Sequence, residues 1–72
     1  MKRKIEGYYD FQDGDLLVVN GVVKAQVREV KATHEFILFF SDDVGTSMYV
    51  GKKGPHADDI LNAVWTALTL KW

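Results

Sequence analysis

The chain has 72 residues, of which 47% are hydrophobic, with a formal net charge of −1 and no cysteine. This composition argues against disorder, and the lack of cysteine excludes disulfide bonds and thiolate metal sites. The near-neutral charge indicates neither a strongly basic nucleic-acid binder nor an acidic mimic of DNA.

A chain of this length predicts one domain spanning residues 1–72, which buries only roughly 60% of the surface its unfolded chain exposes. Small cores without disulfide bonds often gain further burial by oligomerising. The longest aliphatic and aromatic run is Phe36 to Phe40, far shorter than the ~20 residues of a membrane helix. The basic start, Met1 to Lys4, is followed by acidic residues and not by the apolar stretch of a signal peptide. We therefore expect a soluble, cytoplasmic protein.

The N-terminal part predicts a strand and a turn. Residues Ile5 to Phe11 alternate loosely and contain three aromatic side chains, which is typical of a first strand. Gln12 to Asp15 predicts a turn because Asp-Gly tolerates backbone angles that most residues resist. The acidic residues in and before this turn lack the spacing of an EF-hand, so no calcium site is expected.

The clearest folding signal is Asn20-Gly21, which lies between two apolar runs. It predicts a two-residue type I′ hairpin, and such a turn fixes the register of the strand pair. The resulting pairs are Val19 with Val22, Val18 with Val23, Leu17 with Lys24, and Leu16 with Ala25. If Lys31 to His34 form the next loop, Val27 faces Leu38 and Ala25 faces Phe40.

Side chains alternate between the two sides of a strand, so this register predicts two faces. The first face carries Leu16, Val18, Val23, Ala25, Val27, Leu38 and Phe40. The second face carries Leu17, Val19, Val22, Lys24, Gln26, Arg28, Ile37 and Phe39. Because one helix covers only one face, either the sheet closes into a small barrel or the second face contacts another copy or another protein.

The C-terminal part predicts one further strand and a helix. Ser47 to Gly51 is the strand, with Met48 and Val50 on one side and Tyr49 on the other. Gly54-Pro55 predicts a helix start, and the apolar spacing of residues 56–72 predicts an amphipathic helix. The predicted fold class is α+β: a small antiparallel β-meander of four or five strands followed by one C-terminal amphipathic helix packed on one face.

Catalytic residues are not indicated. His34 and His56 are the only histidines, and neither has a metal-ligand spacing such as HExxH. No sequence pattern pairs an acid with a base, and no cofactor fingerprint is present. We therefore expect no enzyme, cofactor or metal site. A hydrolase would require the fold to bring a carboxylate beside one of the two histidine rings.

The leading functional hypothesis is a non-enzymatic protein-binding module, expected to be a homodimer. It would occupy the surface of a larger partner, as small accessory and inhibitor proteins of phages and mobile elements do. This hypothesis is based on the surplus of apolar surface in a chain that is too small to bury all of it. The expected contact residues are Leu17, Val19, Lys24, Arg28, Ile37 and Phe39.

The alternative is a small nucleic-acid-binding domain. Gly51-Lys52-Lys53-Gly54 runs into the predicted helix start, where glycines allow close backbone approach and lysines supply charge. These four residues resemble the GXXG loop with which KH domains clamp a nucleic-acid backbone, although the order of elements around them differs. The aromatic ring of Tyr8 could stack on a base beside the basic N-terminus. The expected residues are Lys52, Lys53, Gly54 and Tyr8.

Overall fold

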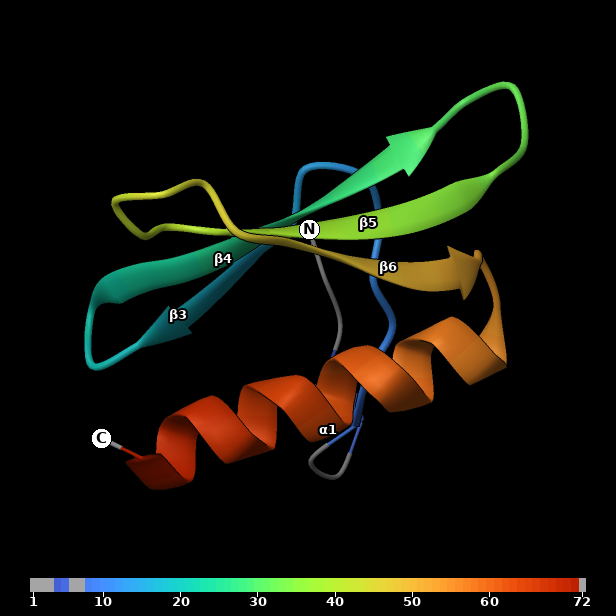
Figure 1. The fold of residues 1–72 in the computed structure, drawn as a ribbon. Helices are drawn as coiled ribbons and strands as arrows, with labels where there is room; N and C mark the ends of the chain where they lie inside the picture. The colour runs from blue at the N-terminus through green and yellow to red at the C-terminus, as the bar shows by residue number, and fades with distance from the viewer. Residues whose placement is uncertain (1–3, 6–7, 72) are drawn as a thin grey trace.

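The computed structural model describes residues 4–5 and 8–71. Its main sheet has four antiparallel strands in the order β3-β4-β5-β6. These strands are β3 (Leu16–Val19), β4 (Val22–Val30), β5 (Glu35–Phe40) and β6 (Ser47–Lys52). The helix α1 (Pro55–Lys71) lies along one side of the sheet (Figure 1). The predicted α+β class is confirmed, and the sheet stays open instead of closing into a barrel.

The predicted first strand, Ile5 to Phe11, was wrong in its extent. The strand residues near the N-terminus are β1 (Lys4–Ile5) and β2 (Tyr8–Tyr9), which pair with each other as a separate antiparallel ladder. The ladder does not join the main sheet. Residues 10 and 11 continue from β2 without strand geometry, because α1 takes the place of a neighbouring strand, as described below.

Two predicted turns are confirmed. Asn20 and Gly21 have φ angles of 52° and 78°, the left-handed backbone that a type I′ turn requires at both positions. Residues 31–34 join β4 to β5, and the register places Val27 opposite Leu38 and Ala25 opposite Phe40 as expected. His34 closes this loop with a φ of 59°.

The register between β3 and β4 was wrong beyond the first two pairs, because β4 contains a bulge. Leu17 lies opposite Ala25 and Leu16 opposite Gln26, while Val18 still lies opposite Val23. Lys24 is therefore the extra residue of the bulge.

The bulge follows from anchors at both ends of the strand pair. At one end the tight turn places Val19 opposite Val22. At the other end the amide of Val27 donates to the carbonyl of Asp15, at 2.8 Å. Between these anchors β3 advances four residues (15 to 19) and β4 advances five (22 to 27). β4 therefore has one residue more than β3 between the anchors, and the bulge accommodates it. As a result, every β3 side chain lies on the opposite face of the sheet from the one that a regular ladder predicts.

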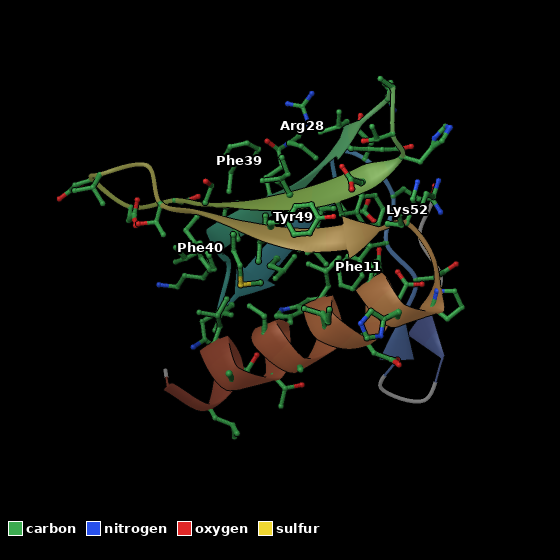
Figure 2. The ribbon with its side chains drawn as sticks, turned by 45° about the vertical axis from the view of Figure 1, so that its right-hand side comes forward. Phe11, Arg28, Phe39, Phe40, Tyr49 and Lys52 are labelled. Atoms are coloured by element: carbon green, nitrogen blue, oxygen red, sulfur yellow. The ribbon has the colours of Figure 1, made fainter. Side chains whose placement is uncertain are left out.

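The core is a single layer between α1 and the inner face of the sheet, which is the face toward α1. The strands contribute Leu17, Val19, Ala25, Val27, Phe36, Leu38 and Val50, and α1 contributes Ala57 and Leu61. Phe11 completes this layer from outside the sheet, with 1% of its surface exposed. Figure 2 shows Phe11 between the sheet and α1.

Side chains of α1 hold the N-terminal segment in place. The Asn62 side chain accepts a hydrogen bond from the Tyr9 amide (3.0 Å) and donates one to the Tyr9 carbonyl (2.8 Å). Asp58 accepts a hydrogen bond from the Phe11 amide (3.1 Å). The Tyr9 ring meets the Trp65 ring edge to face, with centroids 5.5 Å apart. The helix thus supplies the backbone partners that a neighbouring strand would otherwise give.

Candidate functional site

The outer face of the sheet, which points away from α1, carries a group of apolar side chains that are exposed or, for Ile37, half-buried. We call this group the outer band; it consists of Leu16, Val18, Val23, Ile37, Phe39 and Tyr49. Exposure reaches 45% for Leu16, 44% for Phe39 and 63% for Tyr49, although large apolar side chains are normally buried. Figure 2 shows Phe39 and Arg28 on the side of the sheet opposite Phe11.

The strand register arranges the outer band as a diagonal. Val18 and Val23 face each other near the β3–β4 turn. The next row of the ladder contains Leu16 and, across Gln26 of β4, Phe39. The row after that pairs Ile37 with Tyr49. The band therefore crosses all four strands, from the β3–β4 turn toward β6.

The charged groups beside the outer band are bound within the chain. Nε of Arg28 donates to Oδ1 of Asp13, at 3.2 Å. The Tyr49 hydroxyl donates to Glu35 at 2.7 Å, and the Thr33 hydroxyl donates to the same carboxylate at 2.9 Å. These two bonds lower the pKa of Glu35, and the bond to Glu35 raises the pKa of Tyr49. Opposite charges are thus close together beside the band: Arg28 and Lys31 are paired with Asp13, and the charge of Lys52 acts on Glu35.

The structure places only three of the six expected contact residues on the outer face: Arg28, Ile37 and Phe39. The predicted exposure of Leu17 and Val19 was wrong, since they are 0% and 5% exposed and belong to the core. The bulge turns them inward and turns Leu16 and Val18 outward in their place. Leu16, Val18 and Val23 were assigned to the wrong face for the same reason.

The predicted position of Lys24 on the outer face was also wrong, and the cause is again the bulge. Lys24 lines an open recess of about 380 Å³ at the edge of the core layer, together with Phe40 of β5 and Leu68 of α1. Ser41, Asp42 and Thr46 complete the rim. Asp42 accepts a 2.9 Å hydrogen bond from the Thr46 amide. Hydrogen bonds from Thr46 lower the pKa of Asp42 and keep it charged.

The Gly51 to Gly54 segment lies beside the β4–β5 loop. The amide of Lys53 donates to the His34 carbonyl (2.7 Å), and Nζ of Lys52 donates to the Thr33 carbonyl (3.2 Å). Nζ of Lys53 donates to Gln12, at 3.0 Å. Lys52, Lys53 and Gly54 thus share one end of the sheet. Tyr8 lies in β2, and its side chain is outside the described part of the structure.

The same end of the sheet holds a carboxylate beside His34. Nδ1 of His34 lies 3.0 Å from Oε2 of Glu29, and Nζ of Lys31 lies 3.6 Å from the other oxygen. The Glu29 side chain is 8% exposed. The hydrogen bond from His34 is the main cause of its lowered pKa, and desolvation opposes it. Sequence reasoning missed this pair, although a loop that returns the chain after Val30 could have suggested it.

The Glu29–His34 pair meets one requirement of the hydrolase hypothesis. A nucleophile hydrogen-bonded to the imidazole is the second requirement. Among the residues whose side chains the structure describes, Glu29 is the hydrogen-bond partner of this ring, and the nearby Thr33 hydroxyl is bound to Glu35. Glu29 also forms ion pairs with Lys31 and Lys53 at this end of the sheet.

Across residues 4–5 and 8–71, no three histidine or acidic side chains form a metal-binding group. The helix in this part of the chain is not long and apolar enough to cross a membrane. Comparisons with protein families, with characterised proteins and with solved structures find no match.

Proposed function

We propose that the protein is a non-enzymatic binding module that docks its outer band on a protein partner and acts by covering that partner's surface. The observation that supports this is the gathering of six apolar side chains on the one face that α1 leaves open. An accessory or inhibitor role fits such a module, since covering a surface requires no reacting group.

The size of the outer band suits protein contact. Its exposed fractions correspond to roughly 500 Å² of apolar surface, within the ~300–600 Å² of the largest patches on monomers, which are often functional. Burying an apolar patch on a partner is favourable. The affinity that remains after the ~4–15 kcal/mol cost of association depends on how well the two surfaces fit and not on area alone.

Site-specific photo-cross-linking tests this proposal. A photoreactive phenylalanine analogue placed at position 39 should give discrete covalent protein adducts in cells that naturally produce the chain. The same analogue at Val44 is the matched control, because Val44 is 84% exposed but lies in the 41–46 loop. The absence of adducts from position 39, or equal adducts from both positions, would contradict the proposal.

The nucleic-acid alternative has one observation in its favour. Lys31, His34, Lys52 and Lys53 meet at one end of the sheet through the contacts described above. This function predicts oligonucleotide binding that weakens steeply as salt rises, because phosphate contacts release counterions. Binding that is lost in the double variant Lys52→Ala, Lys53→Ala would favour this alternative over the outer band.

A further inference from the structure

We infer that the protein seated on the outer band is a second copy of this chain, so that two sheets pack face to face. This inference rests on the proposed function and names the partner. The predicted complex has four layers, in which each α1 lies outside and the two outer bands meet in the middle. Packed sheets lie ~10 Å apart, a distance that interdigitating side chains of this size fill.

The diagonal course of the outer band makes it self-complementary. A two-fold axis that lies in the interface, either along the band or across it, maps the band onto itself. Apolar rows then meet apolar rows in both copies. Phe39 lies in the middle row of the band, beside Leu16 across Gln26. It is therefore near the centre of the contact in either arrangement.

The charges beside the band suit a second copy. Arg28 is paired with Asp13, and the positive charge of Lys52 acts on Glu35, which the Tyr49 and Thr33 hydroxyls also bind. Opposite charges therefore lie close together beside the band, so two copies do not repel each other. A strongly charged partner would find no matching field on this face, whereas the same face on another copy is equally neutral and equally apolar.

The available area fits a small dimer. The two outer bands together offer roughly 1,000 Å² for burial, about the least that a specific interface needs. The share of one copy is about a tenth of its 4842 Å² surface. Tyr49 and Phe39 are residue types enriched at the centres of interfaces, where charged residues are depleted.

Sedimentation analysis of the purified chain over a range of concentrations tests the inference. The wild type should sediment as a species of twice the 8.2 kDa monomer mass. Phe39→Lys should weaken dimerisation about 30-fold or more, as expected for a central interface residue. Val44→Lys should leave it within about twofold, because its charge is added away from the band. Circular dichroism establishes that both variants fold.

Cross-linking gives a second readout that does not depend on a disruptive variant. The natural chain has no cysteine, so Phe39→Cys introduces a single thiol. A short bismaleimide should join two Phe39→Cys copies, but should not join two Val44→Cys copies above the level of random collisions.

The possible outcomes distinguish a failure of this inference from a failure of the proposed function. In one outcome, the purified chain stays monomeric while the photoreactive probe at position 39 captures a different protein in cells. This result excludes a second copy as the partner and leaves the proposed function in place. A monomer whose probe captures no protein overturns both. A dimer that Phe39→Lys does not weaken overturns the inference, because its interface then lies elsewhere.

Discussion

Phe11 makes the largest contribution to the core of any residue outside the main sheet. Its ring is fully enclosed and lies 5.0 Å from the Tyr9 ring and 6.0 Å from the Trp65 ring. Its removal would leave a cavity between layers that the sheet and α1 cannot close by themselves.

We therefore expect Phe11→Ala to lower the free energy of unfolding by about 3–5 kcal/mol, the usual cost of removing a buried phenyl ring. For a domain this small, such a loss approaches the whole stability. Leu70→Ala is the control, because Leu70 is 82% exposed on α1 and its truncation should change stability by less than ~0.5 kcal/mol. Urea unfolding of both variants measures the difference. Equal losses would mean that Phe11 does not close the core.

Among the elements, the β3–β4 pair shows how one residue decides which side chains are buried. The sequence of β3 is Leu-Leu-Val-Val, so either register places one leucine and one valine in the core. The hydrophobic pattern therefore cannot choose between the two registers. The choice is made by the hydrogen bond between Val27 and Asp15, which lies outside the hairpin turn.

Deleting Lys24 should make the β3–β4 ladder regular while keeping Leu17 and Val19 buried. Without Lys24, the pair of Val18 with Val23 is followed directly by the pair of Leu17 with Ala25. We expect the deletion variant to fold and to lose about 1 kcal/mol or less, in part from the Ser41 amide that donates to the Lys24 carbonyl. Deleting Arg28 instead should prevent folding, because it shifts the register in the middle of the β4–β5 ladder. Urea unfolding compares the two deletions, and a larger loss from the Lys24 deletion would contradict this account of the bulge.

Sequence reasoning was most successful where the signal is local. The Asn20-Gly21 turn, the β4–β5 register, the β6 strand with Tyr49 outward and the helix start at Pro55 all depend on neighbouring residues. It failed for the β3 faces and for the N-terminal segment, whose anchors lie far away in the chain. Half of the expected contact residues were misplaced because a bulge has no local signature in this sequence. A single sequence also gives no sign that Asn62 binds the Tyr9 backbone.

For the whole molecule, acid should weaken folding because four carboxylates are held in their charged form. Hydrogen bonds and nearby cations lower the pKa of Asp13, Glu29, Glu35 and Asp42. A group whose folded pKa is below its unfolded value contributes stability above the unfolded pKa, and this stability is lost as pH falls through the folded pKa. We therefore expect the free energy of unfolding to fall steeply below about pH 4.

Asp58 has the opposite effect on the pH dependence of stability, because its pKa is raised and not lowered. Desolvation is the main cause of its raised pKa, and the charges of Asp10 and Asp59 add to it, while the hydrogen bond from the Phe11 amide and the charge of Lys53 oppose it. Its contribution is present at low pH and is lost as pH rises through its folded pKa. The Asp58→Asn variant should no longer lose the stability that the wild type loses through Asp58 as pH rises above about 4. It should still lose stability in acid, because the other four carboxylates are unchanged. Urea unfolding from pH 2 to pH 7 measures both slopes. An unchanged profile in Asp58→Asn would contradict this assignment.

The attachment of the N-terminal segment to α1 has a consequence for the order of events during folding. Tyr9 and Asn62 are 53 residues apart, and Phe11 and Asp58 are 47 apart. The three hairpins of the sheet join neighbouring strands and can form as each strand leaves the ribosome. The early segment, in contrast, has to wait for a helix that follows every strand in the chain. Until α1 emerges, Phe11 has no layer to enter, and a nascent chain would expose apolar surface on both faces of its sheet.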